Sequence, residues 1–215
     1  PANVTIAARM PDADTILRGL ARVADQFLLL AGVWHLLVAV ALAALARGAR
    51  PTRRTAAALL LAPIASVSAL AWLTANPFNA AVFAGLFALL ALVAARMQPR
   101  PLARAPAWAR TLGGLALAYA WVYPHFLASH HPALYLVAAP MGLLPCPTLA
   151  MVLGFGLLAH GLGSRAWALL TGAAGLFYAL FGALRLGVWL DCGLLVAAVA
   201  TLTCAWRTPP ARTRP

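Results

Sequence analysis

The chain has 215 residues, of which 64% are hydrophobic and 9% are charged, and its mean hydropathy is +0.88. This composition excludes a soluble globular domain and predicts an all-α integral membrane protein that crosses the bilayer several times. The formal net charge is +12, and all 16 basic residues are arginine. The arginines cluster in short segments between apolar runs, which is typical of membrane topology and predicts no nucleic-acid partner.

The amino-terminal segment, residues 1–25, is predicted to lie on the membrane and not to cross it. Residues 12–25 place their apolar side chains on one helical face and their charges elsewhere. This pattern favours a short amphipathic helix in the interface, with Asp14 or Thr15 as its amino-terminal cap.

Residues 26–206 are predicted to form one transmembrane domain of about seven spans, followed by a basic tail, 207–215. A run of 21 apolar residues extends about 31 Å as a helix, and the hydrocarbon core is about 30 Å thick. The fifth span is expected to start at Cys146 or Thr148 and to end near His160. The other spans are expected at 26–46, 55–74, 78–95, 107–123, 165–184 and 190–206.

The second span contains residues that predict a specific local structure. Pro63 removes a backbone donor in the middle of the span and predicts a kink. Ser66 and Ser68 are predicted to form hydrogen bonds to neighbouring helices.

The distribution of arginines predicts the orientation of the domain. With seven spans, twelve of the 16 arginines fall on one side of the membrane and four on the other. The positive-inside rule therefore places the amino terminus outside and the carboxyl terminus inside.

Residues 121–148 interrupt the helical pattern and are the predicted location of a site. This stretch holds five of the 16 prolines and three of the five histidines. Pro145 and Pro147 favour extended conformations at the residues that precede them, Leu144 and Cys146. The apolar run 133–144 is too short to cross a bilayer and predicts a re-entrant segment between the fourth and fifth spans.

The predicted topology brings the uncommon polar side chains of the domain to the outer face. Polar groups at membrane depth are costly and mark functional sites. Asp191 is expected to pair with Arg185, and Cys146 to act with His131 as a soft ligand or polar gate. The candidate ligand-binding residues are Asn76, Tyr123, His131, Cys146, Thr148, Arg185 and Asp191.

Several short motifs along the chain carry a resemblance to a known family. They are Asn76-Pro77, Phe83 to Phe87, Tyr123-Pro124, His131-Pro132 (or His130 for the histidine), Gly142, Pro145 to Thr148, Gly154 and Asp191 to Leu195. With these motifs the chain resembles the bacterial multi-pass family catalogued as domain of unknown function six-zero-six-four. The resemblance extends from about residue 12 to 205 and is most specific in the Tyr-Pro, His-Pro and Pro-Cys-Pro-Thr motifs. It implies a helical membrane fold in the bacterial cytoplasmic (inner) membrane and implies no activity.

Several chemistries are open for Cys146. With His125, His130 or His131 it has the ligand types of a soft or borderline metal ion. It could form a disulfide with Cys192 in an oxidising compartment. At a helix start beside a histidine it could also be a nucleophile.

Three functions follow from these readings. The first is a non-enzymatic membrane protein that binds or passes a small solute or metal ion at the outer face. The second is a non-catalytic accessory subunit of a larger membrane complex, with a membrane-protein partner. The third is a membrane thiol enzyme, and a simple plug closing the outer face is the alternative to any site. The lipid bilayer is the expected partner of the domain. No catalytic residue is predicted, and the sequence does not identify a cofactor.

Overall fold

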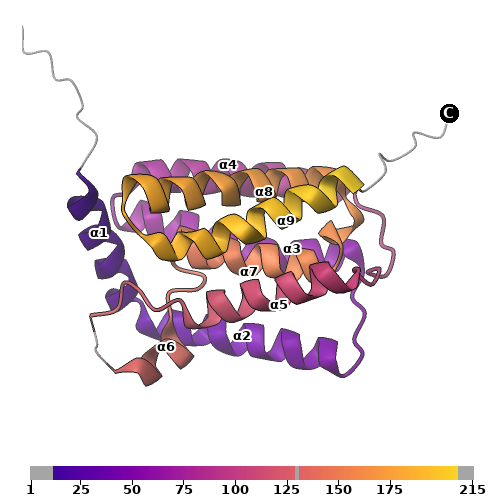
Figure 1. The fold of residues 1–215 in the computed structure, drawn as a ribbon, viewed down its shortest axis with the longest axis horizontal. Coiled ribbons are helices and arrows are strands. Elements are labelled where there is room, and N and C mark those ends of the chain that lie inside the picture. Colours follow the sequence, from indigo (N-terminus) through magenta and orange to yellow (C-terminus); the bar gives the residue numbers. More distant parts are fainter. Residues whose placement is uncertain (1–11, 129–130, 208–215) are drawn as a thin grey trace, which may run out of the picture.

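The computed structural model describes residues 12–128 and 131–207, and this part of the chain is helical (Figure 1). The α-helices are α1 (Ala13–Gln26), α2 (Leu28–Ala46), α3 (Arg53–Leu73), α4 (Pro77–Arg96), α5 (Ala107–Val122), α6 (Pro132–Ala138), α7 (Pro145–Leu158), α8 (Arg165–Leu180) and α9 (Cys192–Arg207). Three short elements complete them: the 3₁₀-helices η1 (Gly161–Gly163) and η3 (Trp189–Asp191), and the π-helix η2 (Phe181–Arg185). The predicted all-α class is confirmed.

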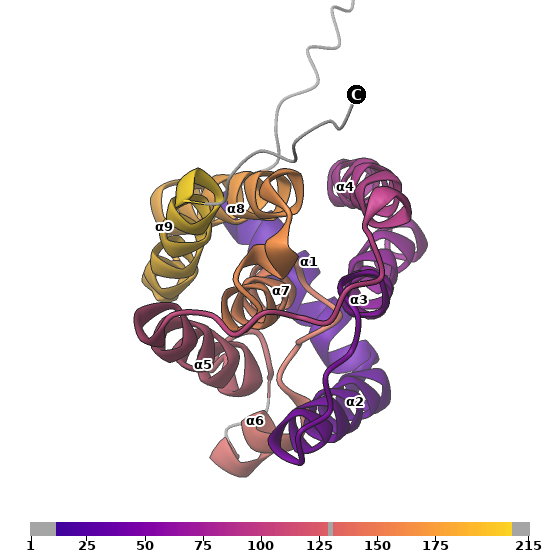
Figure 2. The same cartoon turned by 90° about the vertical axis from the view of Figure 1, so that its right-hand side faces the viewer.

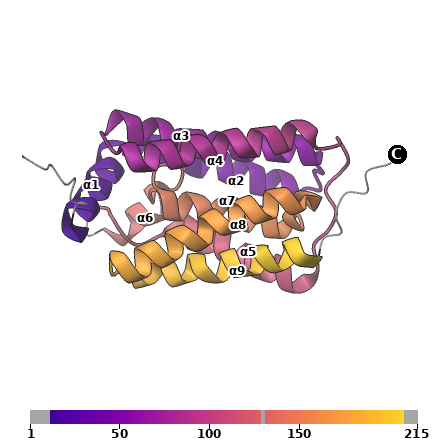
Figure 3. The ribbon, with the colours of Figure 1, turned by 90° about the horizontal axis from the view of Figure 1, so that it is seen from above.

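Seven of these helices run along the long axis of the molecule: α2 to α5 and α7 to α9 (Figures 1 and 3). Five helical segments are long and apolar enough to cross a membrane: α2, α3, α4, the continuous α8–η2 segment and the η3–α9 segment. The helices α5 and α7 have 16 and 14 residues, so they extend only about 24 and 21 Å. A helix therefore occurs at each predicted span, and five of them have spanning length.

The short helix α7 lies in the centre of the bundle (Figure 2). Most of its residues are buried, including Leu149, Val152 and Leu153 at 0% exposure. It is apolar all round, as expected for a helix surrounded by other helices. The core of the protein is therefore built around a helix that is shorter than a bilayer is thick.

The amphipathic helix α1 lies across one end of the bundle, beside the start of α2 (Figure 1). Its cap is Asp12, whose carboxylate accepts a hydrogen bond from the Thr15 amide at 2.7 Å, so the predicted caps Asp14 and Thr15 are wrong by a few residues. Hydrogen bonds from the backbone and the side chain of Thr15, with smaller effects of Arg18 and Arg185, hold the pKa of Asp12 below its ordinary value.

The opposite end of the bundle gathers the arginine-rich connections (Figure 1). The α2–α3 and α4–α5 loops pair there through an antiparallel bridge between Thr52 and Pro101, with the Arg53 amide donating to the Arg100 carbonyl at 2.9 Å. All four aspartates lie in α1 or η3, or cap α1, at the other end. The two ends thus differ strongly in charge.

Helix α3 confirms both serine predictions. The Trp34 indole of α2 donates to the Ser66 hydroxyl at 3.2 Å, and the Ser68 hydroxyl donates to the Ala80 carbonyl of α4 at 2.9 Å. The helix is continuous from Arg53 to Leu73, through Pro63. Such bonds fix neighbouring helices where apolar contact alone is not directional.

The proline-rich stretch contains the α6 helix, followed by a buried turn. These two elements stand where one re-entrant segment was predicted at 133–144. Helix α6 ends at Ala138 and lies against α2 and α5 at the α1 end of the bundle (Figure 1). Residues 139–144 are buried and non-helical, and they lead to the amino terminus of α7. This turn requires Gly142, whose φ is +79° and whose missing side chain makes room for the Trp34 indole.

The Pro-Cys-Pro motif forms the first turn of α7. Leu144 is extended, with φ −113° and ψ 152°, as predicted, but Cys146 is helical, so the predicted extension of Cys146 is wrong. The first turn of a helix leaves amide donors without intrahelical partners. Pro145 and Pro147 lack those donors, so the helix can begin inside a buried region.

Replacing Pro147 by alanine is therefore expected to destabilise the protein, although this change normally favours a helix. The new amide would be buried, and the cap residue Leu144 has no side-chain acceptor for it. We expect a loss of about 1–3 kcal/mol in the free energy of unfolding, measured by denaturation in detergent. The mid-helix replacement Pro63→Ala is the control, since it restores an intrahelical donor; equal behaviour of the two variants would contradict the capping role.

Candidate functional site

Asp191 is the polar centre of the α1 end of the bundle. It lies in η3, directly before α9, and its side chain is 1% exposed. The carboxylate rests against Gly182 of the π-helix η2, where a Cβ atom would overlap the Oδ2 atom. The Val188 amide donates to the Gly182 carbonyl at 2.9 Å and holds the connection between α8 and α9 in this form. A buried carboxylate thus occupies space that only glycine leaves open.

Neutral groups surround the carboxylate. The Tyr123 hydroxyl donates to Oδ1 at 2.8 Å, and the Cys146 thiol donates to Oδ2 at 3.3 Å. The Tyr119 hydroxyl is 3.5 Å from Oδ1 and donates to the Leu190 carbonyl at 2.7 Å. We call Asp191, Tyr119, Tyr123 and Cys146 the Asp191 cluster. Every hydrogen-bond partner of this carboxylate in the described part of the chain is neutral, so no cationic side chain is paired with it.

The members of the Asp191 cluster come from three separate parts of the fold. Tyr119 is in the last turn of α5 and Tyr123 is the residue that caps this helix, and their rings meet edge to face at 5.3 Å. Cys146 is in the first turn of the central helix α7. The cluster therefore joins α5, α7 and the α8–α9 connection, and it can accept hydrogen bonds or a positive charge.

Three of the predicted site residues come together in this cluster: Tyr123, Cys146 and Asp191. Thr148 is 0% exposed and accepts a hydrogen bond from the Gly142 amide at 2.9 Å, so it holds the turn before α7. Asn76 caps α4 by accepting from the Asn79 amide at 3.1 Å. Thr148 and Asn76 stabilise the backbone and lie outside the cluster.

The predicted pair of Arg185 with Asp191 is wrong. Arg185 is exposed at the end of η2, and the carboxylate is bonded to the groups named above. The physical reason is the π-helical turn, which is wider than an α-turn and changes the face on which the following residues lie.

The histidines do not join Cys146. His125 packs against the Phe126 ring at 4.2 Å, and burial lowers the pKa of its imidazole because the charged form loses water. His131 is exposed at the cap of α6, and His130 lies outside the described residues. Within 12–128 and 131–207, no three His, Cys, Asp or Glu side chains gather to hold a metal ion.

The predicted disulfide is absent, because neither Cys146 nor Cys192 is bridged in the described part of the chain. Cys192 is exposed and Cys204 is buried. The sulfur of Cys146 faces Asp191, so its hydrogen-bonding partner is a carboxylate and not one of the predicted histidines.

Sequence reasoning missed two parts of this end of the bundle. Tyr119 was overlooked, although its spacing of four from Tyr123 is a detectable signal. A second buried pair, in which the Tyr178 hydroxyl donates to the Asn79 side chain at 2.9 Å, links α8 to α4. Nothing in the local sequence identifies that pair, because its members are 99 positions apart.

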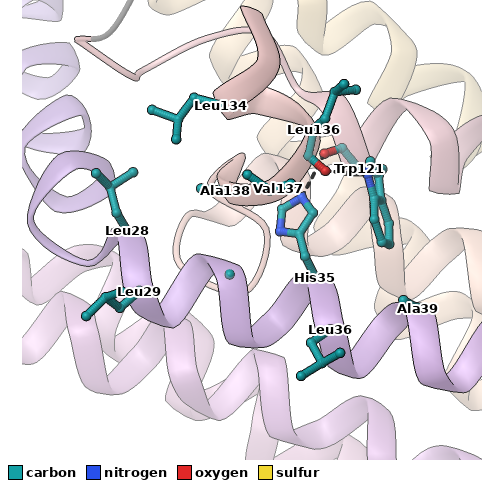
Figure 4. Close-up of a pocket in the computed structure, with 11 residues that line it drawn as sticks. Leu28, Leu29, His35, Leu36, Ala39, Trp121, Leu134, Leu136, Val137 and Ala138 are labelled. Atoms are coloured by element: carbon teal, nitrogen blue, oxygen red, sulfur yellow. Dashed lines mark hydrogen bonds between the residues drawn. The ribbon is translucent and has the colours of Figure 1, made fainter. Parts of the chain in front are cut away.

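A separate apolar groove runs beside α2 (Figure 4). Its walls are α2, the α6 helix and Trp121 at the end of α5, and it has a volume of about 500 Å³. The His35 ring at its floor points toward the Trp121 carbonyl, with Nε2 at 3.0 Å from that oxygen, while Nδ1 is 2.9 Å from the Ala31 carbonyl. The groove and the Asp191 cluster share no residue.

The fold and the site define an all-helical protein with several helices of membrane-spanning length and a buried polar cluster at one end. Comparison of the chain with protein-family models, curated proteins and solved structures found no match in any of the three.

Proposed function

We propose that the protein crosses the bacterial inner membrane seven times, as a relative of the family that its motifs resemble. The arginine-rich end faces inside, and α1 lies on the outer surface. Two features support this arrangement: the seven longitudinal helices and the separation of arginine-rich loops from the aspartates. Local thinning of the bilayer and snorkelling of flanking residues accommodate helices as short as α5 and α7.

The orientation predicts opposite accessibility of two cysteines. Cys192 is exposed near the α1 end, and Arg100 is exposed in the loop at the other end. In intact cells, a membrane-impermeant maleimide is expected to label native Cys192 and to leave a cysteine in Arg100→Cys unlabelled until the cells are opened. Labelling of the Arg100→Cys position from outside would reverse the proposed topology.

We propose that the protein is not an enzyme and that it binds a small solute at the Asp191 cluster. The observation that carries this proposal is a carboxylate that is 1% exposed and bonded only to neutral groups. An anion in this position is costly and is typical of a functional group inside a membrane protein.

The chemistry of the cluster selects the class of solute. The carboxylate attracts a positive charge or a hydrogen-bond donor. Oxygen atoms from Asp191, Tyr119 and Tyr123 outnumber the single sulfur, and oxygen ligands suit hard cations and organic ammonium groups better than soft metals. We therefore propose a small monovalent cation, with methylammonium and sodium as the probes.

Thermal unfolding in detergent tests this proposal. Methylammonium or sodium chloride, compared at constant ionic strength with choline chloride, is expected to raise the Tm of the unmodified protein. The increase should disappear in Asp191→Asn, which keeps the shape of the side chain but removes the charge. Asp14→Asn is the matched control, because Asp14 is exposed on α1, and it should respond like the unmodified protein. Equal responses of the two variants would reject the site.

A second candidate function is a non-catalytic accessory subunit. It is favoured by α2, which is the least buried of the five long apolar segments and exposes Leu29, Val33 and Val40. A partner helix could cover this surface. Migration of the protein with a second membrane protein in mild detergent would support this function, and the solute response of Asp191 would then be absent.

A further inference from the structure

We propose that the groove beside α2 binds one acyl chain of a phospholipid from the leaflet at the α1 end of the bundle. The groove is formed by two walls that do not close on each other. One wall is α2, and the other is α6 with the end of α5 (Figure 4). This inference rests on membrane insertion and is independent of the solute proposed for Asp191.

The groove matches one leaflet in length. It extends along α2 from Leu28 to Ala39, which is about 16 Å at 1.5 Å per residue. Half of a hydrocarbon core of about 30 Å is about 15 Å. The groove also starts at the end of α2 that adjoins the surface helix α1. A chain that enters at that surface and ends near the bilayer midplane therefore fits it.

The walls of the groove offer hydrocarbon to an occupant. Of the eleven lining residues, nine are aliphatic or glycine. The other two are His35 and Trp121, and both already have hydrogen bonds within the protein. The His35 ring lies between two carbonyl oxygens, and the Trp121 indole donates to the Leu136 carbonyl at 2.9 Å. An apolar occupant therefore leaves neither of these two side chains without a hydrogen-bond partner.

The width of the groove distinguishes an acyl chain from a protein helix. A volume of about 500 Å³ over about 16 Å gives a cross-section of about 30 Å². A helix with its side chains is about 10–12 Å wide, which corresponds to a cross-section of about 80–110 Å². The backbone of α6 lies close to α2 at Gly32, where a Cβ atom would be in ordinary van der Waals contact with the Val137 carbonyl oxygen, at 3.7 Å. A helix would have to displace α6, but a single chain would not.

Photolabelling tests the groove directly. The protein is reconstituted in phosphatidylcholine nanodiscs with a trace of phosphatidylcholine that carries a diazirine on one acyl chain. After irradiation, labelled peptides are mapped by mass spectrometry. We expect label to concentrate on residues 28–39 and 131–138, above the level on the lipid-facing residues of α4.

Variants that fill the groove, compared with a variant outside it, test whether the label comes from the groove. Ala39→Phe places a ring in the groove, and Leu36→Trp does so at a more exposed position. Both are expected to lower the label on these peptides to the level of α4, while the neighbouring change Val40→Phe, on a residue outside the groove, leaves it unchanged. Label spread evenly over all lipid-facing helices, label unaffected by Ala39→Phe and Leu36→Trp, or cross-links from α2 to another protein would overturn the proposal.

Discussion

Replacing Gly182 by alanine is expected to be among the most damaging single changes in the protein. The added Cβ would overlap the Oδ2 atom of Asp191 and lie 2.7 Å from its Cγ atom. The carboxylate would have to leave its position and lose the hydrogen bonds from Tyr123 and Cys146. A buried carboxyl group left without partners costs about 3 kcal/mol or more, so we expect a large fall in the free energy of unfolding.

The control for this change is Gly85→Ala on α4, where no atom lies within 4 Å of the added Cβ. Since alanine favours a helix by about 1 kcal/mol over glycine, Gly85→Ala should be neutral or stabilising. Chemical denaturation in detergent measures both variants. If Gly182→Ala proved as stable as Gly85→Ala, Asp191 would not lie against η2.

A second large effect is expected where α5 crosses the central helix α7. A Cβ atom at Gly113 would lie 2.8 Å from the Gly154 carbonyl oxygen and 3.0 Å from the Leu157 Cβ atom. Because the nearest of these atoms is backbone, neither helix can yield without moving as a whole. Gly113→Ala is expected to cost about 1–3 kcal/mol, and Gly113→Leu should prevent the two helices from packing.

The neighbouring glycine offers a closely matched control. Gly114 follows directly in the sequence and has no atom within 4 Å of an added Cβ, so Gly114→Ala should retain or improve stability. The Gly113 variants should also weaken the Asp191 cluster, because Tyr119 lies in α5 and Tyr123 caps it. Equal stability of Gly113→Ala and Gly114→Ala would mean that α5 and α7 do not cross at these glycines.

The helices could be predicted from the sequence because long apolar runs between arginine clusters have few alternatives in a membrane. The same runs set which ends of the helices meet, and this placed Tyr123, Cys146 and Asp191 at one end. The details that failed depend on local turns. The hydrophobic pattern of the sequence could not predict the π-helix at Phe181–Arg185. This turn separates Arg185 from Asp191.

The Pro-Cys-Pro motif shows a different limit. Residues that precede proline are usually extended, and Leu144 follows this tendency while Cys146 does not. The preference is overcome because the first turn of α7 is buried, and two prolines remove donors that would otherwise be unsatisfied there. The motif could be recognised as important from its composition, but its role required knowing that α7 lies in the centre of the bundle.

The most direct test of the Asp191 cluster is isothermal titration calorimetry of the purified protein with methylammonium chloride and with sodium chloride, alongside Asp191→Asn and Asp14→Asn. We predict saturable binding of one cation per chain to the unmodified protein and to Asp14→Asn, and none to Asp191→Asn. Equal binding by Asp191→Asn, or no binding by the unmodified protein, would contradict the proposed site and leave Asp191 as a structural link between α5, α7 and α9.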